Sequence, residues 1–259
     1  MLLENKVAIV SGIGPGMGRD ISLAFAREGA KLALAARSPG KLDEVLAEVR
    51  AAGAEAVAIP TDITKPEDCA RLVAAAHGAF GRVDVLVNNA FHQGHYVPIE
   101  SADLEKWRVP FEVNVLGTLR LTQQVIPLMK KQGGGSIVMI NSMVIRDVLP
   151  TMADYAASKA ALMAATQGLA RELGPSQIRV NSVVPGYIWG ASLEWYFGDQ
   201  ARRRGITAQQ VYDEVAAQTA LRHLPTSEEI APAVLFFASD LSRVITGQSL
   251  DVNGGHVFK

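Results

Sequence analysis

The sequence predicts an α/β fold in which one doubly wound parallel sheet of about seven strands carries helices on both faces. Short runs of Val, Ile, Leu and Ala lack the alternation typical of half-exposed strands, so we expect strands covered on both faces. Longer stretches with helical spacing separate these runs, which predicts right-handed crossovers between parallel strands. The first run leads directly into a glycine-rich segment, Ser11 to Arg19.

Apolar runs and helical stretches alternate along the chain. The expected strands are residues 7–10, 32–36, 56–59, 83–87, 136–140 and 180–184. The expected helices are residues 17–28, 41–52, 66–80, 112–131 and 152–173. Gly29 and Gly53 lie where two of these helices should end, and Pro66 fits the first turn of another. Pro110 is expected to separate a short helix that begins near Ser101 from the longer helix that follows.

The composition favours one folded domain over residues 1–259. Apolar residues make up 49% of the 259 positions and charged residues 20%, which is enough for a sizeable core. The 25 Lys and Arg residues are balanced by 26 Asp and Glu residues, which argues against a nucleic-acid or membrane-binding surface. No apolar run reaches the ~18 residues of a membrane span, and no signal peptide opens the chain, so we expect a cytoplasmic protein.

The residues that commonly bind metals give no reason to expect a metal site. Cys69 is the single cysteine, which excludes an intrachain disulfide and a thiol cluster, and it lies in a helical pattern where we expect it to be buried. His92 and His95 are three residues apart, but no carboxylate or cysteine lies near them in the sequence. We therefore favour a substrate-side loop over metal ligation for these two histidines.

The glycine-rich segment has the context of a dinucleotide-binding loop, because it follows a strand, opens a helix and begins a βαβ unit. Gly12 can form the tight turn, Gly16 lets the backbone approach a pyrophosphate, and Gly18 allows close packing of helix on sheet. The N–H groups and the positive dipole end of the helix then face the phosphates. The alternative is a glycine-rich turn without a ligand. The context favours a Rossmann-type domain.

The spacing S-G-x-x-x-G-x-G differs from the common dinucleotide fingerprint, and further motifs follow it in order. They are LVNNA at 86–90, VNVLGT at 113–118, INS at 140–142, YAASK at 155–159 and RVNSVVPG at 179–186. With these motifs the chain resembles the short-chain dehydrogenase/reductase family in its compact form, over nearly its whole length. The resemblance implies an NAD(P)-dependent oxidoreductase that interconverts a secondary alcohol and a ketone by hydride transfer.

Tyr155 and Lys159 are four residues apart, so on a helix they share one face. A free tyrosine has a pKa of ~10, and we expect the ammonium of Lys159 to lower the pKa of Tyr155. Tyr155 would then exchange a proton with an alcohol or alkoxide. The alternative is a surface pair on the helix. The resemblance implies that Ser142 orients the substrate oxygen and that Asn114 holds a water that links Lys159 to solvent.

The resemblance also implies which residues contact the cofactor. The residues implied at the cofactor are Gly12, Gly14, Gly16, Met17, Gly18, Arg37, Asp62, Ile63, Asn89, Ala90, Tyr155, Lys159, Pro185, Gly186 and Ile188. NAD enzymes of this fold place an acid after the second strand, where this chain has Ala36 followed by Arg37. A guanidinium there can pair with a 2′-phosphate, which favours NADP over NAD. Pro15 takes a loop position where NADP-preferring relatives often carry a second basic residue, and Arg37 could instead be a surface charge.

Two positions depart from the family pattern. Phe91 replaces the glycine that usually ends the N-N-A-G motif, so this side chain must point away from the cofactor or narrow the site. Gly190 stands where the family often has a threonine that binds the carboxamide, and Ser192 could substitute for it.

Residues 190–218 are longer than a simple connection and follow the end of a strand, so we expect a lid over the active site. The alternative is a helix pair that packs its aromatic residues into the core. Aromatic residues in and beside the lid favour an apolar or cyclic small-molecule substrate, although the arginines at 202–204 could receive a carboxylate.

Three further expectations rest on the resemblance. An enoyl reductase is disfavoured, because divergent members of that class space the Tyr and Lys more widely. A cofactor-binding regulator without turnover is also disfavoured, because such proteins usually lose one of the two residues. A homotetramer or homodimer is expected, with the helices at 112–131 and 152–173 paired between subunits.

Overall fold

One parallel sheet of seven strands forms the centre of the computed structural model, which describes residues 1–258. The strands are β1 (Val7–Ser11), β2 (Lys31–Ala36), β3 (Ala56–Pro60), β4 (Val85–Asn88), β5 (Gly135–Ile140), β6 (Ile178–Pro185) and β7 (Ser249–Val252). Their order across the sheet is β3-β2-β1-β4-β5-β6-β7, and every neighbouring pair is parallel. The predicted doubly wound α/β fold is confirmed.

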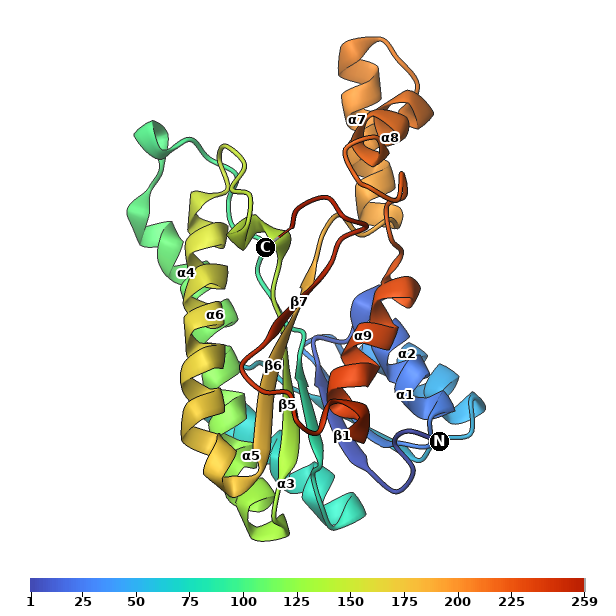
Figure 1. The fold of residues 1–259 in the computed structure, drawn as a ribbon, viewed down its shortest axis with the longest axis vertical. Coiled ribbons are helices and arrows are strands. Elements are labelled where there is room, and N and C mark those ends of the chain that lie inside the picture. The colour runs from blue at the N-terminus through green and yellow to red at the C-terminus, as the bar shows by residue number, and fades with distance from the viewer. Residues whose placement is uncertain (259) are drawn as a thin grey trace.

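Helices cover both faces of the sheet (Figure 1). On one face lie α1 (Met17–Arg27), α2 (Pro39–Ala51) and α9 (Ser227–Ala238), and on the other lie α3 (Pro66–Phe80), α5 (Thr118–Gln132) and α6 (Ala153–Leu173). Each layer buries its own apolar cluster against the strands. Because both faces are covered, the strands are almost wholly apolar, as the sequence predicts. Cys69 is fully buried in α3.

Two elements, β7 and α9, were not placed by the sequence pattern, and one predicted helix begins irregularly. The strand β7 has four residues, none of them fully buried, so it carries no continuous apolar run. The helix α9 has apolar residues on most of its surface and an internal Pro232, so a 3.6-residue period is hard to recognise. The helix predicted over residues 112–131 is present, but its first six residues, Glu112–Gly117, form a π-helix.

The expected break at Pro110 is wrong. A short helix, α4 (Arg108–Phe111), contains Pro110 in its first turn and continues through the π-helix into α5 without interruption. A proline is tolerated there because the N–H groups of the first turn have no helical acceptor. The short helix expected near Ser101 is replaced by two 3₁₀ turns, Ile99–Ser101 and Leu104–Trp107.

The order of the strands reverses between β1 and β4, which is where ligands bind in open sheets of this kind. Ser11 pairs with Asn88 at the carboxyl end of this strand pair. The loops that follow, with the glycine segment on one side and Asn89 on the other, are therefore neighbours. The helices α7 (Ala191–Arg204) and α8 (Ala208–Ala216) project at one end of the molecule, beyond the two helical layers (Figure 1).

Candidate active site

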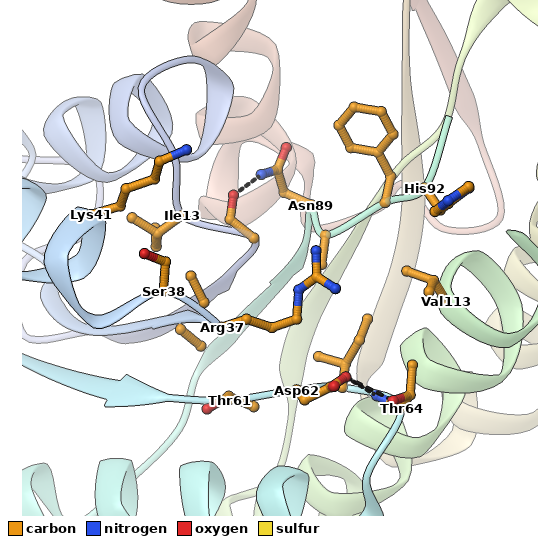
Figure 2. A pocket seen from close by; sticks show the side chains of 16 residues that line it. Ile13, Arg37, Ser38, Lys41, Thr61, Asp62, Thr64, Asn89, His92 and Val113 are labelled. Atoms are coloured by element: carbon orange, nitrogen blue, oxygen red, sulfur yellow. Dashed lines mark hydrogen bonds between the residues drawn. The ribbon is translucent and has the colours of Figure 1, made fainter. Parts of the chain in front are cut away.

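The glycine segment packs closely on the neighbouring loop at the carboxyl end of β1. Gly12 has a φ of +78°, and a Cβ atom there would lie 2.4 Å from the backbone nitrogen of Ala90. A Cβ atom on Gly18 would lie 2.5 Å from the carbonyl oxygen of Gly12. The Asn89 amide donates a hydrogen bond of 2.8 Å to this same oxygen (Figure 2). Glycine is therefore required at positions 12 and 18 to bring the loop against Asn89.

The middle of the glycine segment, by contrast, is uncovered. A Cβ atom on Gly14 or Gly16 would meet no protein atom within 4 Å. Gly16 caps α1, so the first N–H groups of that helix face the same open space. Bare backbone beside a helix N-terminus is the donor set that suits a diphosphate, so the residues present fit a dinucleotide.

Two adjoining cavities lie along this edge of the sheet, and both are lined by Asn89 and Phe91. The outer cavity has a volume of about 570 Å³, and the inner cavity has a volume of about 380 Å³. The predicted cofactor residues in the outer cavity are Gly12, Arg37, Asp62, Ile63, Asn89 and Ala90. Those in the inner cavity are Gly16, Met17, Asn89, Tyr155, Lys159, Pro185, Gly186 and Ile188. Gly14 and Gly18 line neither cavity.

The outer cavity contains two residues that the sequence analysis missed. Ser38 and Lys41 line it together with Arg37, and all three are exposed (Figure 2). Ser38 precedes α2, and its hydroxyl makes no capping bond to that helix. The position of Lys41, four residues after Arg37, is the sequence signal that could have revealed a second cation. Across the cavity, the Asp62 carboxylate is already hydrogen-bonded, because its Oδ1 accepts hydrogen bonds from the N–H and the hydroxyl of Thr64.

Ser142, Tyr155 and Lys159 meet in the inner cavity. Ser142 comes just after β5, at the carboxyl edge of the sheet, and its hydroxyl lies close enough to the phenol of Tyr155 to lower the pKa of that group. Tyr155 lies in the first turn of α6, and Lys159 follows one turn later on the same side. The Lys159 ammonium donates a hydrogen bond of 2.8 Å to the carbonyl oxygen of Ile140, at the end of β5.

The expected lowering of the Tyr155 pKa by Lys159 is not what the structure gives. Burial raises the pKa of Tyr155 to about 12, although the nearby hydroxyl of Ser142 opposes this shift. Burial also lowers the pKa of Lys159 to about 7, so this side chain is half neutral near neutral pH. The sequence argument placed a full ammonium beside the phenol, whereas desolvation in the protein disfavours the charged form of both groups.

Asn114 lies in the π-helix and is fully buried. Its Nδ2 donates to the carbonyl oxygen of His92 and to the hydroxyl of Ser158, both at 2.9 Å, and its Oδ1 accepts from the N–H of His92 at 2.7 Å. The side chain lines neither cavity. These three hydrogen bonds join the Asn114 side chain to His92 and Ser158.

The loop after β4 brings together residues that are far apart in the sequence. Phe91 is 58% exposed, and its ring centre lies 5.9 Å from Nζ of Lys159. His95 has a carboxylate partner after all, because its Nδ1 lies 2.8 Å from Oδ2 of Asp154. The sequence argument found no acid near the histidines, since Asp154 is 59 residues away. In the described chain, residues 1–258, no group of three His, Cys, Asp or Glu side chains is arranged to hold a metal ion.

The segment expected to form a lid contains the helices α7 and α8. They form an apolar cluster of their own with Trp189, in which Phe197 is fully buried and Tyr212 stacks edge-on against the indole. Trp195 and Tyr196 remain exposed. Trp189, Gly190 and Ser192 line the inner cavity.

The three arginines of α7 do not reach that cavity. Those at positions 202 and 203 pair with Asp199, and the third pairs with Glu214. Within residues 1–258, no helix is both long enough and apolar enough to cross a membrane.

Known proteins resemble this chain over nearly its whole length. The family model described as Enoyl-(Acyl carrier protein) reductase matches residues 12–256. An uncharacterised oxidoreductase of Methylorubrum extorquens is 38% identical over 98% of both chains. The 3-oxoacyl-[acyl-carrier-protein] reductase FabG of Thermotoga maritima is 34% identical over the full length of both.

A solved structure agrees with these sequence relatives. It is a 7α-hydroxysteroid dehydrogenase in complex with NADH and 7-oxo glycochenodeoxycholic acid. It superposes with a TM-score of 0.88 at 33% identity, covering 99% of this chain and 96% of its own. The names of the FabG reductase and the steroid dehydrogenase indicate different substrates, although both match this chain over nearly its whole length. The chain therefore belongs to the short-chain dehydrogenase/reductase family and is an NAD(P)-dependent oxidoreductase.

Proposed function

We propose that this protein interconverts a secondary alcohol and a ketone, with Tyr155 as the general acid and base. The observation that carries the proposal is the meeting of Ser142, Tyr155 and Lys159 in one cavity that adjoins the bare glycine backbone. Ser142 follows directly on β5, and Tyr155 and Lys159 lie in α6, so a substrate oxygen between Ser142 and Tyr155 would be held in one place.

A bound nicotinamide dinucleotide supplies or accepts the hydride in this chemistry. In the direction of reduction, the Tyr155 phenol gives its proton to the substrate oxygen, and the Ser142 hydroxyl stabilises the charge that develops there. Because burial raises the pKa of Tyr155 to about 12, the phenol is protonated and ready to donate at neutral pH. Lys159 can take up or release a proton near neutral pH, because burial lowers its pKa to about 7.

The outer cavity favours NADP over NAD as the cofactor. Arg37 and Lys41 supply two cations, and Ser38 adds a free hydroxyl, on the side of the cavity that follows β2. No acidic side chain follows β2 there to bind both ribose hydroxyls. In this proposal, Lys41 supplies the second positive charge that Pro15 does not provide in the glycine segment.

The inner cavity favours a neutral apolar or cyclic substrate. Its side-chain surface includes Met17, Phe91, Ile188 and Trp189, and Lys159 is the single charged side chain among the described residues that line it. The arginines of α7 are already paired with acids of α7 and α8, so they are poor candidates for binding a carboxylate. We also propose that the segment 190–218 closes over this cavity as a lid.

Association into a dimer or tetramer is part of the proposal. The helices α5 and α6 form the outer layer on one face of the sheet, so their remaining surface is available to a second copy (Figure 1). Sedimentation velocity on the purified protein would test this association directly.

Enoyl reduction is the second candidate, and the description of the matching family model favours it. The four-residue spacing of Tyr155 and Lys159 argues against it, because divergent enoyl reductases space these residues more widely. A screen that includes an enoyl thioester beside ketones and alcohols separates the two reactions.

The test is a screen of ketones, secondary alcohols and an enoyl thioester with NADPH and NADH, run with the wild type and with Tyr155→Phe. We expect turnover of a cyclic ketone with NADPH, and a loss of ~10²–10⁴-fold in kcat in the variant, because the proton donor is removed. Cofactor affinity, measured by fluorescence titration, should be unchanged. Cofactor binding without turnover of any compound would instead support a regulator, and full activity of Tyr155→Phe would contradict the proposed role of Tyr155.

A further inference from the structure

Residues 91–96, named the histidine loop here, run from the end of β4 past the start of α6 and are attached at two points. At the first point, the Asn114 side chain accepts a hydrogen bond of 2.7 Å from the N–H of His92 and donates one of 2.9 Å to the carbonyl oxygen of His92. The Asn114 side chain thus forms hydrogen bonds with both the N–H and the carbonyl group of His92. This attachment fixes the first half of the loop to the π-helix.

The second attachment is Asp154, a buried carboxylate that the proposed mechanism does not use. Its side chain is only 5% exposed. Its Oδ2 accepts the backbone N–H of His95 at 3.1 Å and lies 2.8 Å from Nδ1 of the same residue. Its Oδ1 accepts the backbone N–H of Tyr155 at 2.7 Å. The same carboxylate therefore joins the second half of the histidine loop to the tyrosine of the active site.

The loop is shaped for this contact. Gly94 has a φ of +82°, and a Cβ atom there would lie 2.5 Å from Oδ1 of Asp154 and 3.0 Å from Cβ of Tyr155. The N–H of Gly94 donates to Nδ1 of His92 at 3.1 Å, which requires that Nδ1 carry no proton and that the ring be neutral. Burial, together with the neighbouring His95, lowers the pKa of His92 and so favours that neutral form.

The placement of the loop also determines one wall of the site. Phe91, its first residue, lines both cavities and lies 5.9 Å from Nζ of Lys159. Tyr96 is the last residue of the loop. It lies close enough to Tyr155 to raise the pKa of Tyr155, although by less than burial does. Loosening the loop would therefore displace one side chain beside Lys159 and another near Tyr155.

We propose that Asp154 is a positioning residue which, through His95, holds the histidine loop closed on Tyr155 and so sets the substrate-side wall of the inner cavity. The pair Asp154–His95 acts as a latch, and Gly94 is the position that lets the latch close. The proposal rests on the proposed function only for the identity of the reaction. The latch itself can be measured without any substrate.

The test compares His95→Leu, which removes the ring nitrogen, with His95→Asn, whose amide nitrogen lies as many bonds from Cα as Nδ1. The matched control is His223→Leu, because His223 and Glu229 form a second His–carboxylate pair at 2.8 Å, away from both cavities. The measurements are amide hydrogen exchange of residues 91–98, cofactor affinity, kcat and KM. Gly94→Ala provides a second way to open the latch if His95→Leu does not fold.

We expect His95→Leu to speed exchange in the histidine loop by ~10-fold and to raise the substrate KM by ~10-fold, since one partly buried hydrogen bond to a carboxylate is lost. The kcat and the cofactor affinity should stay within ~3-fold, because Ser142, Tyr155 and Lys159 remain in place. His95→Asn should restore both quantities, and His223→Leu should change neither.

Wild-type exchange in His95→Leu, or faster exchange with an unchanged KM, would overturn the proposal. A fall in kcat, cofactor affinity and melting temperature together, without rescue by His95→Asn, would show a merely structural role and would overturn it as well. If no compound is turned over, the proposed function fails. The exchange measurement still decides in that case whether the latch exists.

Discussion

At the scale of single residues, the two cavities of the site differ in how strongly burial disfavours charged side chains. In the inner cavity, desolvation disfavours charge, since burial raises the pKa of Tyr155 to about 12 and lowers the pKa of Lys159 to about 7. In the outer cavity, Arg37 and Lys41 are exposed to solvent. Exposed cations can meet a phosphate without a large desolvation cost, whereas the buried pair is suited to move a proton.

The choice between the two nicotinamide cofactors is tested by Arg37→Ala and Lys41→Ala. Each variant should raise the KM for NADPH by ~10–100-fold, because a charge-assisted bond to the 2′-phosphate is lost. The KM for NADH should change by less than ~3-fold, since NADH lacks that phosphate. Steady-state kinetics with both cofactors gives all the values that are needed.

Arg27→Ala is the matched control for this pair, because Arg27 is an exposed arginine at the far end of α1. It should leave both KM values unchanged. Equal losses for NADPH and NADH in the Arg37 and Lys41 variants would show that neither side chain distinguishes the phosphate.

At the scale of elements, α7 and α8 differ from the rest of the molecule. They pack mainly on each other and on Trp189, and their apolar cluster is separate from the two clusters that cover the sheet. Phe197 is the largest fully buried side chain of this small cluster. An element that depends on a small separate cluster can open without unfolding the whole protein, as a lid must.

Phe197→Ala should loosen this segment while the rest of the fold stays intact. Truncating a buried phenylalanine costs ~3–5 kcal/mol, which exceeds what a small cluster can lose and remain closed. We expect trypsin to cleave at the exposed arginines at 202–204 at least ~10-fold faster than in the wild type. The melting temperature of the main transition should change little.

The control is Tyr196→Ala, which removes the neighbouring ring, 45% exposed, from the same helix. Its cleavage rate should match that of the wild type. A large drop in the main melting temperature of Phe197→Ala would instead show that α7 and α8 unfold together with the sheet.

At the scale of the whole molecule, the buried Lys159 makes stability depend on pH. Below about pH 7 both the folded and unfolded states hold its proton, and the folded state bears the cost of a buried ammonium. Between pH 7 and its ordinary pKa of 10.5, the unfolded state still holds a proton that the folded state has released. The contribution of Lys159 to the free energy of unfolding therefore rises with pH across this window.

Lys159→Met should remove that rise. Urea unfolding of the wild type and the variant at pH 6.5, 8 and 9.5 gives the difference between their free energies of unfolding, in which titrating groups distant from Lys159 cancel. We expect the wild type to gain stability relative to the variant as the pH increases. Measurements should stop below pH 10, because Tyr155 then acts in the opposite direction: its folded pKa of about 12 lies above the ordinary value of 10.0. A difference that does not change with pH would contradict a lowered pKa for Lys159.

Local sequence patterns were enough for much of this protein. Apolar runs and helical spacing predicted six of the seven strands and five of the six helices that cover the sheet, because burial on both faces leaves a strong local signal. The motifs around Gly12, Ser142 and Tyr155 predicted the family, since each motif is continuous in the chain. The weaker elements β7 and α9 were missed because their patterns are short or apolar on most sides.

Only the tertiary structure decided the electrostatics and the walls of the site. The sequence shows that Tyr155 and Lys159 are neighbours, but the direction of their pKa shifts depends on burial by other elements. The latch between His95 and Asp154 joins residues 59 positions apart, and no local pattern records such a contact. Periodicity and motifs are properties of neighbouring residues, whereas desolvation and long-range hydrogen bonds exist only once the sheet has brought distant segments together.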